Sequence, residues 1–231
     1  MTKPERARWV GGLLLAGAGI TLFALVSLGN WQLRRLEWKR DLIDTVERRA
    51  YAPEVPPPIG PTNAEAHAYL RVRLSGEFVH SATLKVKALT ELGAGYWLMT
   101  PLQLETGTGP IWVNRGFVPT GFAETDWYRP DGLITLTGLV RISEPNGTAL
   151  QKNDAANNRW FSRDISAFNA ASSLTDAEDY FVDADHLGQP TTYPRGGMTR
   201  LTFRNTHLSY AITWYAMAAL LAGALVFVAR R

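Results

Sequence analysis

The chain has 231 residues, a net charge of +3 and no cysteine. So small a charge, with no basic run interleaved with aromatic residues, argues against nucleic-acid binding. The lack of cysteine excludes disulfides, cysteine-ligated zinc, iron–sulfur clusters and a thiolate nucleophile. The length is enough for one domain outside the membrane plus membrane segments, and the eight Trp and eight Tyr suit such a protein.

The first apolar stretch covers residues 9–33 and follows a short basic segment, residues 1–8. It carries no charge, and as a helix it would place Trp9 and Trp31 about 33 Å apart, close to the separation of two interfacial aromatic belts. A cleaved signal peptide would have a shorter apolar region of about 7–15 residues and a small-residue cleavage site. We therefore predict a transmembrane helix over 9–33, with 1–8 as a cytoplasmic tail.

The next two segments differ in composition. Residues 34–50 contain no helix breaker and are predicted to extend the first helix. Residues 51–68 contain five prolines and are predicted to form a stiff, extended linker.

Residues 69–204 are predicted to form a β-rich domain outside the cytoplasm. Apolar residues alternate with a period of two, which is typical of half-buried strands, in five runs: 69–79, 82–89, 96–104, 110–118 and 133–142. A further strand is expected at 179–185 and a short helix at 165–174, with Asp164 as its N-cap. Because the first five runs have no helices between them, they favour an antiparallel sheet or a small barrel.

The last apolar stretch, residues 205–229, carries no formal charge apart from that available to His207. At about 37 Å as a helix it is long enough to cross a bilayer, and Arg230 and Arg231 follow it. Small residues at Gly12 and Ala16, and at Ala218 and Ala222, predict that the two spans pack as a pair. The fold class is therefore an α+β membrane protein in which two transmembrane helices flank a mainly antiparallel β domain.

The orientation in the membrane is not decided by charge. Basic residues in both tails favour cytoplasmic ends, but further basic residues follow the first span on its other side: Arg34, Arg35, Lys39 and Arg40. We choose tails in the cytoplasm and the domain outside it.

Three stretches carry a family resemblance. Residues 29–39 (GNWQLRRLEWK) match the pattern G-x-W-Q-x-x-R-x-x-x-K. Residues 95–102 (GYWLMTPL) match G-Y-x-x-x-T-P-L, and residues 112–119 (WVNRGFVP) match V-N-R-G-[WF]-[VI]-P. Residues 205–215 (NTHLSYAITWY) match N-x-H-x-x-Y-A-x-T-W-[FY]. Together, in this order and membrane context, they resemble the Surfeit locus protein 1 family, the Shy-type assembly factors of cytochrome c oxidase.

The resemblance implies a non-enzymatic inner-membrane protein with its domain in the periplasm. Since eight residues precede the first span, whereas mitochondrial members usually have longer N-termini, we expect a bacterial member. The family helps to mature the haem-A-containing oxidase subunit, and its bacterial members are linked to haem A. The expected partners are this core subunit, other assembly factors and the lipid bilayer.

Haem iron needs an axial donor such as a neutral imidazole. On a helix, His207 shares a face with Tyr210 and Trp214. If the spans pack antiparallel, the end of the first lies beside His207. We therefore predict a haem A site with His207 on the iron, Arg34 or Arg35 (or Arg204) on the propionates, and Trp31 and Trp214 against the ring.

Each of these residues also has an ordinary interpretation. His207 could be an interfacial polar residue, Trp31 and Trp214 belt aromatics, and Arg34 and Arg35 lipid-facing charges. In that case the protein would be a scaffold that stabilises the nascent oxidase subunit without binding haem. A two-span receptor is a third possibility.

Other candidate sites are weaker. His67, His80 and His186 lack the spacing of a zinc site, and the absence of cysteine argues against copper delivery. Arg115 is expected to pair with a carboxylate within the domain or to contact a partner, and Asn114 and Pro119 are residue types typical of turns.

Overall fold

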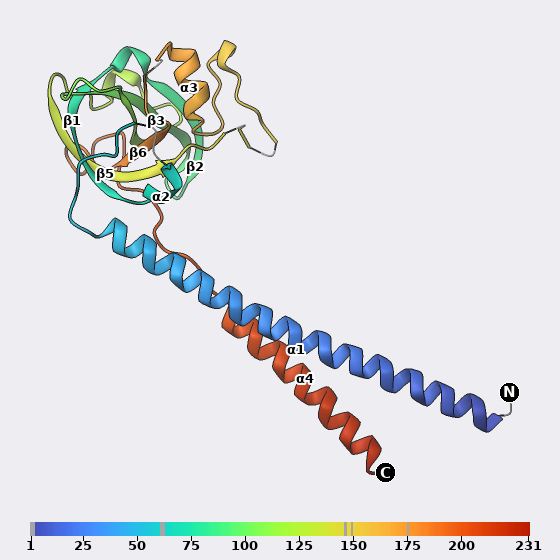
Figure 1. The fold of residues 1–231 in the computed structure, drawn as a ribbon. Helices are drawn as coiled ribbons and strands as arrows, with labels where there is room; N and C mark the ends of the chain where they lie inside the picture. The colour runs from blue at the N-terminus through green and yellow to red at the C-terminus, as the bar shows by residue number, and fades with distance from the viewer. Residues whose placement is uncertain (1–2, 61–62, 146, 149, 175) are drawn as a thin grey trace. The chain divides into compact units, whose positions relative to one another are not determined.

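The computed structural model describes residues 3–60, 63–145, 147–148, 150–174 and 176–231 (Figure 1). The chain divides into two compact units. One combines the segment up to Thr45 with Thr202–Arg231, and the other is Val46–Leu201. The predicted fold class is confirmed: a long apolar helix precedes, and another follows, a mainly antiparallel six-stranded sheet.

The first unit contains α4 (His207–Ala229) and most of α1 (Lys3–Ala50), whose last residues, 46–50, belong to the second unit. Helix α1 continues through residues 34–50 because no glycine or proline interrupts that segment, and it ends three residues before Pro53. Both helices are long and apolar enough to cross a membrane, which indicates a membrane protein. Residues 1–2 of the predicted tail lie outside the described part.

The two helices pack against each other around Gly29 of α1, and in Figure 1 they diverge toward the C-terminal end of α4. A Cβ atom at Gly29 would lie 2.7 Å from a ring carbon of Tyr215, and the Tyr215 hydroxyl donates a hydrogen bond to Asn30 Oδ1 at 2.6 Å. Ala218 is buried as predicted. The expected close approach at Gly12 is wrong, because a Cβ atom there would have no described atom within 4 Å. The close approach occurs at Gly29 instead, because the Tyr215 ring occupies the space that a side chain at position 29 would need.

The second unit contains a six-stranded sheet in the order β1-β5-β6-β4-β3-β2. Its strands are β1 (Arg71–Phe78), β2 (Leu84–Thr90), β3 (Gly93–Leu104), β4 (Ile111–Pro119), β5 (Ile134–Ile142) and β6 (Tyr180–Ala184). The first five overlap the runs predicted from the alternation of apolar residues, and β6 overlaps the further strand expected at 179–185. All neighbours are antiparallel except β4 and β6. Because β1 also pairs with β3, the sheet closes into a small barrel.

The short helices cover parts of this barrel. Helix α3 (Ile165–Ser172) begins as predicted at Asp164, whose carboxylate accepts a hydrogen bond from the Ala167 amide at 3.1 Å. The other short elements are α2 (Ala64–His67) and the 3₁₀ turns His80–Ala82, Glu124–Asp126 and Ala155–Asn157.

The core has two main parts because successive side chains of a strand point to opposite faces. Ile111 and Val113 of β4 lie in one cluster with β1, β5 and β6 residues. Trp112, between them in the sequence, lies in the other cluster and packs against Phe168 of α3, with ring centroids 5.1 Å apart. Strand β4 is therefore buried on both faces.

The proline-rich segment packs on the domain instead of standing free as a spacer. The Val55 amide donates to the Arg71 carbonyl at 3.1 Å, the Arg73 amide donates to the Val55 carbonyl at 2.9 Å, and the Tyr180 hydroxyl donates to the Pro58 carbonyl at 2.8 Å. Residues 61–62 of this segment lie outside the described residues. These bonds fix the extended backbone that the prolines favour.

Candidate functional site

His207 is the first residue of α4, and its ring faces α1. Nδ1 lies 2.7 Å from Oε1 of Gln32, a side chain that is only 9% exposed. The Asn205 side chain accepts a hydrogen bond from the His207 amide at 3.3 Å and so helps to fix the start of the helix. The imidazole is therefore held in the contact between the two helices.

This hydrogen bond selects one form of the ring. A carboxamide oxygen can only accept, so Nδ1 is the donor, and in the neutral ring this tautomer has its lone pair on Nε2. An imidazole whose second nitrogen donates to a carbonyl is the usual arrangement of a histidine that binds a metal. Sequence reasoning recognised Gln32 as part of a motif but gave it no role. The available signal was its place three residues after Gly29, on the same face of α1.

The aromatic residues predicted for the site are partly or largely exposed. Trp31 and Tyr210 are 47% and 56% exposed, and Trp214 is half-buried. On an ideal helix with about 100° per residue, Trp31 lies to one side of Gln32, and Tyr210 lies on the same flank of the antiparallel pair. An apolar, partly open flank therefore adjoins the imidazole.

The two predicted arginines are placed differently. Arg34 and Arg35 are both exposed, and the Arg35 guanidinium stacks on the ring of Trp38 at 4.3 Å. In the described part of the chain, no hydrogen bond or ion pair joins either arginine to His207. By helix geometry Arg35 lies on the Trp31 flank, about 60° from Gln32, whereas Arg34 lies nearly opposite. Arg204 is also exposed. The residues fit a haem ligand and one guanidinium, Arg35, better than a pair of guanidiniums.

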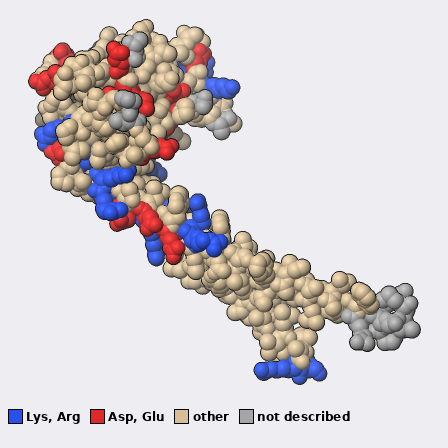
Figure 2. Space-filling view, viewed as in Figure 1, with Lys and Arg blue, Asp and Glu red and all other residues tan. Residues whose placement is uncertain are grey.

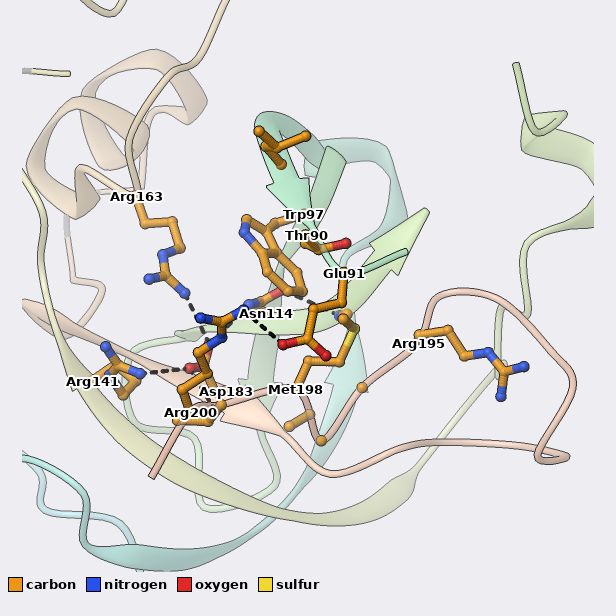
Figure 3. Close-up of a pocket in the computed structure, with 16 residues that line it drawn as sticks. Thr90, Glu91, Trp97, Asn114, Arg141, Arg163, Asp183, Arg195, Met198 and Arg200 are labelled. Atoms are coloured by element: carbon orange, nitrogen blue, oxygen red, sulfur yellow. Dashed lines mark hydrogen bonds and ion pairs between the residues drawn. The ribbon is translucent and has the colours of Figure 1, made fainter. Parts of the chain in front are cut away.

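A second candidate site lies within the β domain (Figure 3). A cavity of about 490 Å³ opens between the β2–β3 hairpin and residues 195–200. Its lining includes Asn114 of β4, Arg141 of β5, Asp183 of β6 and Arg163 from the residues just before α3. The sequence analysis did not identify this cluster. The signal that could have found it is the charged residue inside each of two apolar runs, Arg141 in 133–142 and Asp183 in 179–185.

Asp183 is the centre of the cluster, with its side chain 8% exposed. Its carboxylate accepts four hydrogen bonds: from Asn114 at 2.8 Å, Thr199 at 2.8 Å, Arg141 at 3.1 Å and Arg163 at 3.3 Å. The parallel register of β4 and β6 pairs Asn114 with Asp183 and so places their side chains side by side. Four donors, two of them cationic, compensate the burial of this charge.

Arg163 has a second carboxylate partner. Its Nε donates to Glu144 Oε2 at 3.0 Å and its NH2 to Glu144 Oε1 at 2.5 Å, which is a bidentate pair. Burial alone would lower the pKa of Arg163. The hydrogen bond to Glu144 and the charges of Asp183 and Glu144 outweigh burial, and the pKa is raised.

Asn114 lies within β4, and its side chain makes the bond typical of turns, because its Oδ1 accepts a hydrogen bond from the Gly116 amide two residues on, at 3.1 Å. The carboxylate partner expected for Arg115 is wrong. Arg115 is 1% exposed and bonds to the Tyr128 carbonyl and to Nδ1 of His80, the latter at 3.4 Å. Its guanidinium also lies 5.0 Å from the centroid of the Phe78 ring. Burial, with a smaller contribution from the nearby Arg129 charge, lowers the pKa of Arg115 to about 10.

Metal binding by acidic and histidine side chains has no structural support. The described residues contain no group of three or more His, Asp or Glu that could hold a metal ion. The Asp183 carboxylate in β6 is fully engaged with hydrogen-bond donors from other segments.

Comparisons with known proteins agree with the motifs. The model of the SURF1 family matches residues 19–219. Surfeit locus protein 1 of Takifugu rubripes is 33% identical over 211 residues, which cover 83% of this chain and 87% of the relative. Surfeit locus protein 1 of Homo sapiens is 33% identical over 237 residues, covering 94% and 77%. A SURF1-like protein of Monosiga brevicollis is 31% identical over 236 residues, covering 96% and 89%. The matched span includes every residue of both candidate sites.

Proposed function

The chain belongs to the SURF1 family, and on this premise we propose that it is an assembly factor for cytochrome c oxidase that binds haem A and assists its insertion into the core subunit. The observation that supports haem binding is the 2.7 Å hydrogen bond between His207 and the buried Gln32. It holds an imidazole at the helix contact with its Nε2 lone pair available.

The chemistry that haem A supplies is an iron that accepts a nitrogen lone pair, and propionates that accept hydrogen bonds from guanidinium groups. His207 provides the lone pair, and Gln32 fixes the orientation of its ring. Trp31, Tyr210 and Trp214 provide the adjoining apolar and aromatic surface. A single histidine ligand suits a carrier, because the cargo has to be released.

The propionate partner is best assigned to Arg35. It lies on the same flank of α1 as Trp31, while Arg34 lies nearly opposite Gln32 and is the weaker candidate. The stacking of Arg35 on Trp38 leaves the N–H edges of the guanidinium available for a carboxylate.

The proposal includes the location of the protein. The two apolar helices span the bacterial inner membrane with the chain ends in the cytoplasm and the β domain in the periplasm. There the partners are the oxidase core subunit, other assembly factors and the surrounding lipid. The role requires binding and release, and no catalytic step.

The test uses cells that lack their own family member and either can or cannot make haem A. Protein purified from the first cells should show the absorbance spectrum of haem A, and protein from the second should not. Expression should also restore oxidase activity to membranes of the first cells. Restored oxidase with haem-free protein would support the scaffold function and refute the carrier function. No restoration would refute both.

A further inference from the structure

We propose that the cavity of the β domain is a binding site for a carboxylate carried on an apolar body, and this does not depend on haem binding. Residues 89–91 form one wall, residues 195–200 form another, and the cluster around Asp183 lies inside (Figure 3). The group that is recognised could come from a protein segment or from a free acid, and both present the same chemistry.

The arginines of the lining keep unused N–H donors. Arg141, Arg163 and Arg200 lie beside Asp183 and Glu91, whereas the Arg195 side chain points away from them, with its guanidinium 5.4 Å from the centroid of the Tyr193 ring (Figure 3). Asp183 is shared by Arg141 and Arg163, so these two guanidiniums have more donors than this one carboxylate can accept from.

Arg141 is the incompletely paired cation inside the cavity. Among the described residues its one carboxylate partner is Asp183, at 3.1 Å, and it shares that partner with Arg163. Its guanidinium lies 4.9 Å from the centroid of the Tyr69 ring, and its side chain is 20% exposed. A guanidinium has five N–H donors, so a second carboxylate can still bind to it.

The rim already shows how a carboxylate binds there. Glu91 accepts a hydrogen bond from Arg200 at 2.8 Å, and these side chains are 81% and 75% exposed (Figure 3). Because so exposed an ion pair contributes little to stability, an incoming carboxylate can replace Glu91 on Arg200. Glu91 is thus an internal competitor for the site.

An apolar surface adjoins these charges. Trp97 and Met198 are half-buried in the lining, and the Trp97 ring is held edge-on against Phe117 with centroids 5.9 Å apart. Leu89, at the end of β2, is 86% exposed. A rigid aromatic wall and an exposed leucine beside arginines match a ligand with an acidic end and an apolar body.

The experiment is calorimetric titration of the full-length protein in lipid nanodiscs with 4-phenylbutyrate and with its neutral analogue 4-phenylbutyramide. The acid should bind saturably and the amide at least about tenfold more weakly. Glu91→Gln should tighten acid binding about threefold by removing the competitor, and Arg200→Gln should weaken it about fivefold. Arg73→Gln, which breaks another exposed ion pair of the domain, should leave affinity unchanged.

Equal binding of acid and amide, no saturable binding, or no tightening by Glu91→Gln would overturn the proposal. The source of the carboxylate is distinguished with a peptide that ends in Phe-Leu-COO⁻ and its C-terminally amidated form. Tighter binding of the free-acid peptide than of 4-phenylbutyrate supports a site for a protein terminus. Weaker binding supports a site for a free acid.

Discussion

Replacing Asp183 with Asn tests whether the buried charge cluster holds the barrel together. The substitution keeps the shape of the side chain and removes its charge. Arg141 then has no carboxylate partner in the described structure, and the new amide group presents N–H donors to arginines that are themselves donors. The parallel contact of β4 and β6 loses the acceptor that Asn114 and Thr199 use.

The expected loss follows from the burial of the group. Removing one partner of a buried ion pair typically costs about 3–5 kcal/mol, because the other charge stays buried and uncompensated. For a unit of this size, about 1 kcal/mol lowers Tm by about 2–4 °C, so Asp183→Asn should lower Tm by about 6–20 °C.

The assay is thermal unfolding of the full-length protein in detergent, followed by near-ultraviolet circular dichroism, which reports on the aromatic core. Glu54→Gln is the matched control, since it breaks the ion pair with Arg73, in which both side chains are much more exposed than that of Asp183. That control should cost less than about 1 kcal/mol. Equal shifts in Tm for the two variants would show that the buried Asp183 cluster stabilises the domain no more than an exposed ion pair does.

Three further predictions concern other parts of the chain. Gln32→Leu should weaken haem A binding about 10–100-fold by leaving His207 Nδ1 without its acceptor, and an unchanged affinity in spectrophotometric titration would contradict this. Gly116→Ala should destabilise the domain by more than about 3 kcal/mol, because the glycine has φ +125° and an added Cβ would lie 2.2 Å from the Arg195 carbonyl. A Tm within about 2 °C of that of the wild type would be inconsistent with this loss. Burial raises the pKa of Tyr180, so the folded form holds this proton more tightly than the unfolded chain, and stability falls as pH rises above about 10. Tyr180→Phe has no phenol to ionise, so its free energy of unfolding in urea should fall less between pH 9 and 11 than that of the wild type. A difference in free energy of unfolding that stays constant over this range would exclude a contribution from Tyr180 ionisation.

The parts of the fold that could be predicted are those with a local cause. An uninterrupted apolar stretch can form only a few structures, and α1 and α4 follow from it directly. The strands follow from alternation with a period of two, and α3 follows from the Asp164 cap. The packing of the proline-rich segment could not be predicted in this way, since its backbone partners lie in β1 and beyond.

The candidate sites depend on contacts between distant segments. The helix motifs identified His207, but the role of Gln32 appears only when α1 and α4 are placed together, 175 residues apart in the chain. Asn114, Arg141 and Asp183 lie on three different strands, and one of the pairings that joins them is parallel. A register shift by one residue in any of these strands would turn its side chain to the other face. The composition of each run gives no information about that register.

The role of His207 is measured most directly by the haem A content of purified His207→Ala protein, with wild type and His67→Ala produced in the same haem-A-competent cells. His67 is a histidine of α2 in the β domain, so its loss controls for the removal of an imidazole. Wild type and His67→Ala should carry haem A, and His207→Ala should lose at least about nine-tenths of it, as expected for loss of an axial ligand. Equal haem A in all three proteins would show that His207 does not bind the haem iron.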